Sequence, residues 1–260
     1  MKASFDVLVL TPTTMRPGIL EQTYQSFYMN MFQAVEDRLD INAAVHVDNV
    51  FNFSGSDALD MVDIVKAYLP IYYAEANLTG KCSLARSFHW LWAIAYESQA
   101  KYVFYLEDDW ELLQSVSLLK MIRIMEDNPN LATLRLNFKP SQLGTTKQWA
   151  HFFPWNGQYF ECPESLRPAI GWCGHPSLVN TKFIGQTYPF LNAGICPEHQ
   201  MKGNGLAHDK RMREIIRKWD YGVFGQPDQS PYVKDLGRVW RTKNRIVKYA
   251  DTTWKERKYG

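Results

Sequence analysis

The chain has 260 residues, of which 46% are hydrophobic and 22% are charged, and its formal net charge is only +2. These values suit one α/β domain of ordinary size, and we find no low-complexity tract or internal repeat, which excludes fibrous and repeat architectures. A net charge this small does not indicate any particular kind of binding partner. Its distribution is informative, because residues 201–260 carry an excess of Lys and Arg whereas residues 1–200 carry an excess of Asp and Glu.

Strand and helix patterns alternate through the first half of the chain. Short apolar runs predict strands, and longer stretches with apolar residues three and four positions apart predict helices. In chain order we predict a strand at 5–10 broken by residues 11–14, a helix at 17–35, a strand at 43–47, a helix at 58–69, a strand at 71–74, a helix at 83–97, a strand at 101–106, a helix at 115–126 and a strand at 131–136. This alternation predicts an open, mostly parallel sheet with helices on both faces.

The second half of the chain is less regular. Residues 140–200 are rich in Trp, Phe, Pro and Gly. Such an insert after a nucleotide-type sheet is typical of an acceptor pocket, although it is equally compatible with a packed cap. The apolar N-terminal run meets Pro12 and is too short for a signal peptide or a membrane anchor, so we expect no transmembrane segment.

Three adjacent carboxylates, Glu107, Asp108 and Asp109, directly follow the strand at 101–106. Because like charges repel and lose solvation at a sheet edge, a positive group should lie beside them. Residues 11–14 and Asp48 also follow strands, so these groups could converge in one cleft. Carboxylate oxygens suit Mg²⁺ or Mn²⁺, which could link the cluster to a diphosphate. The alternative is an acidic helix N-terminus stabilised by the helix dipole.

Three stretches carry a family resemblance: "VLVLTPTTMRPGILEQTYQSF" (7–27), "NLTGKCSLARSFHWLWAIA" (77–95) and "KYVFYLEDD" (101–109). Their order resembles that of nucleotide-sugar-dependent glycosyltransferases of the GT-A fold, in which a D-x-D motif holds a divalent metal on the diphosphate. The resemblance covers residues 5–137 well. It implies a single catalytic domain over 1–260, with a nucleotide-sugar-binding half at 1–137 and an acceptor half with a basic tail at 138–260.

The resemblance implies roles for individual residues. The metal ligands would be Glu107 and Asp109, with Asp235 where the family often has a His; His175 and His208 are rivals for that third position. The nucleotide-sugar-binding residues would be Thr11, Thr13, Arg16, Asp48, Gly80, Lys81, Arg86, Asp108 and Arg241.

Residue chemistry supports part of this set. Lys81 and Arg86 are cations beside a Gly turn at a helix start, where a phosphate can bind. The alternatives are a surface ion pair for Arg86 and a simple strand-to-helix turn at residues 11–14.

A catalytic base is expected in the second half. The stretch "GWCGHPSLVNTKFI" (171–184) resembles the acceptor-side segment that precedes the catalytic carboxylate of many inverting members. Glu198 follows at the expected place and is our first choice, with His199 second, because an acceptor hydroxyl needs a carboxylate or His to take its proton. A solvent-exposed loop Glu is the alternative.

The tail "RVWRTKNRIVKYADTTWKERKYG" (238–260) interleaves cations with Trp and Tyr. It could track a nucleic-acid backbone, touch an acidic membrane surface, or form a solvated helix face. The four cysteines, Cys82, Cys162, Cys173 and Cys196, contain no C-x-x-C pair, which predicts reduced thiols in a cytoplasmic protein.

The favoured function is a metal-dependent transfer, with Mn²⁺ or Mg²⁺, of a hexose from a nucleotide sugar such as UDP-glucose. The favoured acceptor is a hydroxymethylated pyrimidine in DNA, as for the phage-type and base J-related DNA-base glucosyltransferases. A cell-surface polysaccharide or lipid-linked glycan is the alternative acceptor. A nucleotidyltransferase is disfavoured because residues 11–16 lack glycines, and a non-catalytic nucleic-acid-binding protein would leave the three carboxylates unexplained.

Overall fold

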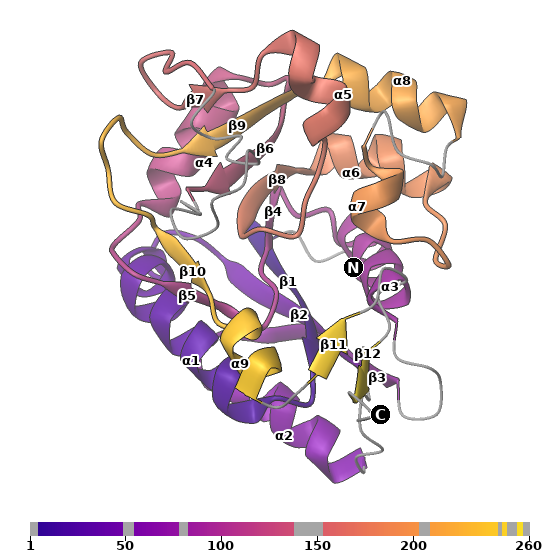
Figure 1. Cartoon of the computed structure of the whole chain (residues 1–260). Coiled ribbons are helices and arrows are strands. Elements are labelled where there is room, and N and C mark those ends of the chain that lie inside the picture. Colours follow the sequence, from indigo (N-terminus) through magenta and orange to yellow (C-terminus); the bar gives the residue numbers. More distant parts are fainter. Residues whose placement is uncertain are drawn as a thin grey trace.

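The computed structural model describes residues 5–48, 55–77, 83–137, 153–202, 209–243, 246–248 and 254–256. Strands and helices alternate along these residues (Figure 1). The strands are β1 (Val7–Thr14), β2 (Ile41–Asp48), β3 (Ile71–Asn77), β4 (Tyr102–Tyr105), β5 (Trp110–Leu112), β6 (Leu131–Leu136), β7 (Phe160–Glu161), β8 (Ser177–Asn180), β9 (Asp220–Phe224), β10 (Val233–Asp235), β11 (Ile246–Lys248) and β12 (Trp254–Glu256). The helices are α1 (Pro17–Phe27), α2 (Gly55–Lys66), α3 (Leu84–Ser98), α4 (Leu118–Asp127), α5 (Arg167–Ile170), α6 (Thr181–Thr187), α7 (Pro197–Gln200), α8 (Lys210–Lys218) and α9 (Gly237–Lys243).

An eight-stranded sheet joins both halves of the chain in the order β3-β2-β1-β4-β8-β6-β9-β7. The neighbours β3-β2, β2-β1, β1-β4 and β6-β9 run parallel, whereas β8 runs antiparallel to both β4 and β6, and β7 runs antiparallel to β9. The predicted class, an α/β fold with a mostly parallel sheet flanked by helices, is confirmed, and the sheet is mixed.

The sheet separates two apolar layers. One face packs against α1, α2 and α4, whose apolar residues repeat every three or four positions, as Leu20, Tyr24 and Phe27 do in α1. The other face packs against α3, α6 and α8, and Phe88, Trp92 and other aromatic side chains fill that layer. Both faces of the central strands are therefore covered, which explains their nearly unbroken apolar sequences.

The first strand is longer than the sequence predicts. β1 continues through residues 11–14 and pairs with β2 as far as Thr14 and Asp48, so the predicted break at Pro12 is wrong. On its other side β1 pairs with β4 only as far as Leu10, whose carbonyl oxygen accepts a hydrogen bond from Leu106 N at 3.0 Å. Pro12 points to that same side, beyond the end of β4, so its missing N–H leaves no ladder bond unmade.

Two further differences concern short strands. The predicted irregular region at 140–200 contains β8, which lies inside the sheet; its four residues follow Gly and Pro and are too few to show a period. The sequence also gave no sign of β5, which starts immediately after Asp109 and pairs with β10.

The C-terminal segment returns to the carboxyl ends of the first strands (Figure 1). Leu236 N donates a hydrogen bond to Asp109 O at 2.7 Å, which fixes the start of α9 beside the carboxylate triplet. The C-terminal strands β11 and β12 form an antiparallel pair. In the described part of the chain, no helix combines the length and the apolar character needed to cross a membrane.

Candidate functional site

A pocket lies at the carboxyl ends of β1, β2 and β4. The sequence predicts that polar residues after these three strands meet, and the structure brings them together. Because parallel strands end at the same sheet edge, residues far apart in the chain line one cavity. Its lining residues are Pro12, Thr13, Thr14, Arg16, Asp48, Leu84, Ser87, Glu107, Asp108 and Asp109.

The positive group beside the triplet is Arg16. Its guanidinium contacts both oxygens of Asp108 and lies 3.2 Å from Asp109 Oδ2. Asp108 also accepts hydrogen bonds from Thr13 Oγ1 at 2.9 Å and from Thr14 N at 3.0 Å. The side chains of Arg16 and Asp108 are only 2% and 4% exposed. This is a buried, multiply hydrogen-bonded ion pair, which is stable only because each charge compensates the other.

Electrostatics keep the Arg16 guanidinium charged. Burial lowers its pKa, but Asp108 and then Asp109 raise it more, so the net shift is upward. For Asp108, burial raises the pKa of the carboxyl, against the opposing effect of the Arg16 charge. Arg16 also lies under the α9 residue Trp240, with 5.2 Å from its central carbon to the ring centroid, so the guanidinium has an aromatic cover.

Asp109 is held between two elements that are distant in sequence. Its carboxylate faces Arg16 on one side and Arg241 Nη1 of α9 on the other, at 3.8 Å. A Cβ atom added at Gly237, the first residue of α9, would overlap Asp109 Oδ2. Position 237 therefore requires glycine for a steric reason, because the Asp109 carboxylate occupies the space that a side chain at this position would need.

Asp48 lies at the start of α3. Its carboxylate accepts hydrogen bonds from Ser83 N at 2.9 Å, from Ser87 Oγ at 3.0 Å and from Asn77 Nδ2 at 3.0 Å. An acidic group at a helix N-terminus is favoured by the orphan backbone N–H groups and the helix dipole. Asp48 thus fixes α3 against the end of β2, and it forms one wall of the pocket.

Glu107 and Glu198 meet at Gly174. Tyr105 OH donates a hydrogen bond to Glu107 Oε1 at 3.1 Å, and a Cβ atom added at Gly174 would overlap that same oxygen. The backbone N–H of Gly174 donates to Glu198 Oε1 at 3.0 Å. Burial first, and Glu107 second, raise the pKa of Tyr105, so its hydroxyl stays protonated and donates. The carboxylates of Glu198 and Glu107 therefore both lie against Gly174.

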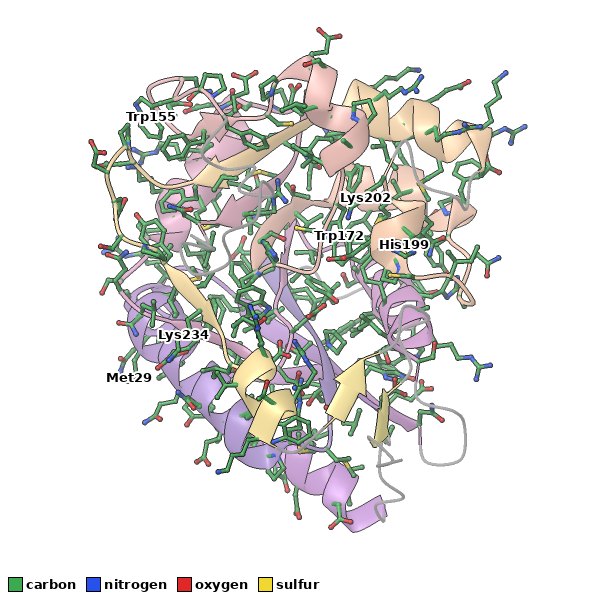
Figure 2. The ribbon with its side chains drawn as sticks, viewed as in Figure 1. Met29, Trp155, Trp172, His199, Lys202 and Lys234 are labelled. Atoms are coloured by element: carbon green, nitrogen blue, oxygen red, sulfur yellow. The ribbon has the colours of Figure 1, made fainter. Side chains whose placement is uncertain are left out.

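The remaining predicted residues are distributed as follows. Thr11 is fully buried, and its hydroxyl is hydrogen-bonded to Tyr24 OH at 2.6 Å, on the core side of β1. Arg86 is exposed on the first turn of α3, and His199 is exposed on α7 (Figure 2). Asp235 Oδ1 accepts a hydrogen bond from Arg238 N at 3.0 Å, so it caps α9. Gly80, Lys81 and His208 lie outside the described residues.

The donor set has the chemistry of a magnesium or manganese site, but it is not a ready-made cage. Across the described ranges, no three His, Cys, Asp or Glu side chains are grouped to hold a metal together. Mg²⁺ is usually bound by one or two carboxylates, with waters and substrate phosphates completing its shell. Asp109 and Glu107 fit that mode, since both line the pocket and each lies against a glycine that leaves room for its carboxylate. Asp108 does not fit it, because Arg16 contacts both of its oxygens.

Several residues of the site escaped the sequence analysis. Ser83 and Ser87 could have been found as the polar first turn of α3, and Gly174 and Gly237 as glycines next to candidate carboxylates. Trp240 had no detectable signal. His175, a rival metal ligand, is hydrogen-bonded to Cys173 and packs edge-on against Trp110, so we leave it out of the donor set.

Comparisons with known proteins show only distant similarity. No family model matches the chain, and no curated protein matches it. Among solved structures, GalNAc-T7 with UDP, GalNAc and Mn²⁺ aligns at TM-score 0.48 and 10% identity, over 85% of this chain and 42% of that chain. The chain thus spans less than half the length of that protein. CMP:2-keto-3-deoxy-manno-octonic acid synthetase complexed with CTP aligns at TM-score 0.46 and 12% identity, over 92% of this chain and 96% of that chain. Mouse xyloside xylosyltransferase 1 aligns at TM-score 0.37 and 12% identity, over 74% of this chain and 73% of that chain.

Proposed function

We propose that the protein is a nucleotide-sugar-dependent glycosyltransferase of GT-A type. The observation that carries this proposal is the convergence, at one sheet edge, of the carboxylate triplet and the ends of β1 and β2 with Glu198 of the second half. A non-catalytic binding protein would not need Glu107 and Glu198 to lie against the same glycine. A nucleotidyltransferase is less well supported, because the loop after β1 carries no glycine before Gly18.

The donor diphosphate would bind at the mouth of this pocket. Asp109 and Glu107 would hold a Mn²⁺ or Mg²⁺ ion, with Asp235 nearby at the start of α9, and the ion would supply positive charge to the leaving diphosphate. Arg16 and Arg241 already lie within 4 Å of Asp109, so they add fixed positive charge at the same place. Asp108 is assigned a positioning role, because it orients Arg16 and the turn at Thr13 and Thr14.

Glu198 is the proposed general base. Its Oε1 accepts a hydrogen bond from the Gly174 N–H, and Gly174 also lies against Glu107, which lines the pocket. An acceptor hydroxyl there would transfer its proton to Glu198 as the sugar bond forms. His199 is a weaker choice, because it is exposed on the outer side of α7.

The donor proposed first is a UDP-hexose, with UDP-glucose as the leading example. The test is a panel of nucleotide sugars incubated with Mn²⁺, with Mg²⁺ and with excess chelator, scored for slow hydrolysis without acceptor. Hydrolysis of one sugar nucleotide that requires the metal is expected. If no member of the panel is bound or hydrolysed with either metal, the transferase proposal fails.

The acceptor proposed first is DNA that carries a hydroxymethylated pyrimidine. A specific observation favours a polyanion: α8 presents five cations in nine residues, and in the described part of the chain none of them has an ion-pair partner; they are Lys210, Arg211, Arg213, Arg217 and Lys218. Such a helix face attracts phosphates through counterion release. Arg241 is better explained by its contact with Asp109 than by DNA binding.

The acceptor is tested by fluorescence titration of a short modified duplex at several salt concentrations. The variant Lys210→Ala/Arg217→Ala/Lys218→Ala should lower the dependence of log K on log salt by about 2–3, because each phosphate contact contributes about 0.9. The control Arg38→Ala/Lys66→Ala/Arg123→Ala removes the same charge elsewhere and should leave the slope unchanged. No binding at low salt, together with transfer to an oligosaccharide or lipid-linked acceptor, would establish the glycan alternative instead.

A further inference from the structure

A second polar cluster lies inside the apolar layer behind β6 and β8. Arg135 of β6 donates a hydrogen bond from Nη1 to Cys173 Sγ at 2.9 Å. His175, two residues further along, also hydrogen-bonds the Cys173 sulfur. The proposed transfer reaction uses none of these three side chains. They surround a nucleophilic atom with two cationic donors, an arrangement that ordinary core packing does not require.

The burial of Arg135 favours a negative charge on Cys173. Arg135 is only 8% exposed, and a guanidinium cannot release its proton at any ordinary pH. A buried cation needs nearby negative charge: Arg135 donates a hydrogen bond to Cys173 Sγ, and the carboxylate of Glu198 also acts on it. Burial by itself would raise the pKa of the Cys173 thiol, but Arg135 and then His175 lower it to about 6. The same pairing raises the pKa of His175, against the effect of its burial.

Hydrogen-bonding capacity is left over around this sulfur. Arg135 Nε and Ser177 Oγ are buried and have no hydrogen-bond partner, and Ser177 lies directly opposite Arg135 across the β6–β8 ladder. Buried polar atoms without partners are uncommon in native proteins, and each calls for a ligand or a chemical role. Cys173 itself is buried, with 9% of the residue's surface exposed.

We propose that Cys173 is a modification site at which a hydroperoxide converts the thiolate to a sulfenic acid. The sulfur attacks the terminal peroxide oxygen and forms an S–O bond, while the O–O bond breaks. The departing oxygen takes a proton from the His175 imidazolium and leaves as water or an alcohol. Sulfur is oxidised by two electrons and the peroxide is reduced by two. Arg135 stabilises the negative charge that moves from sulfur to oxygen.

Cys162 serves as a comparison within the same layer. The charge of Arg135 lowers the pKa of Cys162 as well, but burial has the larger effect and raises that pKa to about 11. The Cys162 thiol donates a weak hydrogen bond to Pro163 O at 3.6 Å. Cys162 is fully buried, and among the described residues the main influences on its pKa do not include a His. The charged groups that act on Cys173 are Arg135, His175 and, more weakly and in the opposite sense, Glu198. A thiolate is therefore expected at Cys173 and not at Cys162.

The wild-type protein tests this proposal without any measurement of turnover. The rate of iodoacetamide labelling is followed for each cysteine peptide by mass spectrometry between pH 5 and pH 10, in the folded and in the urea-denatured protein. The labelling rate of Cys173 should reach half its plateau at about pH 6 in the folded protein, and at about pH 8.5 in the denatured chain, as for an ordinary thiol. This midpoint does not depend on how accessible the sulfur is. A folded-state midpoint near 8.5 would overturn the proposal.

Peroxide treatment followed by a sulfenic-acid trap tests the chemistry itself. At neutral pH, Cys173 should be trapped before Cys162 and before the more exposed Cys196. His175→Gln should slow the trapping and raise the pH midpoint of labelling, whereas Cys162→Ser should change neither. Trapping of Cys196 before Cys173, or an unchanged midpoint in a folded His175→Gln variant, would contradict the proposal.

Discussion

Replacing Asp108 with Asn should destabilise the fold far more than the same replacement at Asp109. Asp108 accepts hydrogen bonds from Thr13, Thr14 and Arg16, and the ion pair that it forms with Arg16 is almost fully buried. Removing one partner of such a pair strands the other charge and costs about 3–5 kcal/mol. Because Asp109 Oδ2 still lies 3.2 Å from Arg16 Nη2, we expect the lower end of that range. In Asp109→Asn the Asp108–Arg16 pair remains, so the free energy of unfolding should fall by only about 1 kcal/mol.

The assay is urea unfolding of the wild type, both single variants and the double variant Arg16→Met/Asp108→Asn. The double variant has no stranded charge. The decrease in its unfolding free energy should therefore be smaller, by about 1–3 kcal/mol, than the sum of the decreases in the two single variants. Equal losses for Asp108→Asn and Asp109→Asn, or strictly additive effects of Arg16→Met and Asp108→Asn, would refute the reasoning that Arg16 is the counter-ion of the triplet.

Three further outcomes follow from the same geometry. Glu198→Gln should lower the transfer rate by roughly 10²–10⁴-fold with nucleotide binding unchanged, whereas His199→Ala should leave the rate intact; the reverse result in single-turnover kinetics would move the base to His199. Gly237→Ala should lower the free energy of unfolding by about 1–3 kcal/mol in thermal denaturation, because the new Cβ atom would overlap Asp109. Gly18→Ala should not lower it, because the Cβ atom there would meet nothing within 4 Å. The Cys173 thiol has a folded-state pKa lowered to about 6, so its contribution to stability is complete above the pKa of an unfolded thiol and falls as the pH drops from about 9 to about 6. The difference in unfolding free energy between wild type and Cys173→Ala should shrink over that window, and a difference independent of pH would argue against a thiolate.

The local sequence pattern was sufficient for the first half of the fold. The predicted strands and helices between residues 5 and 136 are present, because most of them have an apolar period and α3 and α4 begin at the capping residues Ser83 and Ser117. The second half was not predictable in this way. β8 has four residues and β7 has two, and such short strands are defined by their partners across the sheet rather than by their own sequence; the three-residue β5 in the first half was missed for the same reason.

The candidate site shows the same division between local and long-range information. The strand-end rule placed Asp48 and Glu107–Asp109 in one pocket. It did not identify Arg16 as the buried counter-ion, because nothing in "TMRPG" distinguishes a buried Arg from a surface one. The contact of Trp240 and Arg241 with the same cluster depends on the return of the C-terminal segment across more than a hundred residues. Such pairings are properties of the folded topology.

The most direct test of the central claim is a calorimetric titration of UDP into the protein with Mn²⁺. The wild type should bind UDP in the presence of the metal, and binding should be lost in excess chelator. In Asp109→Asn the metal-dependent binding should be lost while the fold persists, because the Asp108–Arg16 pair that supports this end of the sheet is untouched. No binding of UDP by the wild type, or equal binding by the wild type and Asp109→Asn, would contradict a nucleotide-sugar site at the carboxyl ends of β1, β2 and β4.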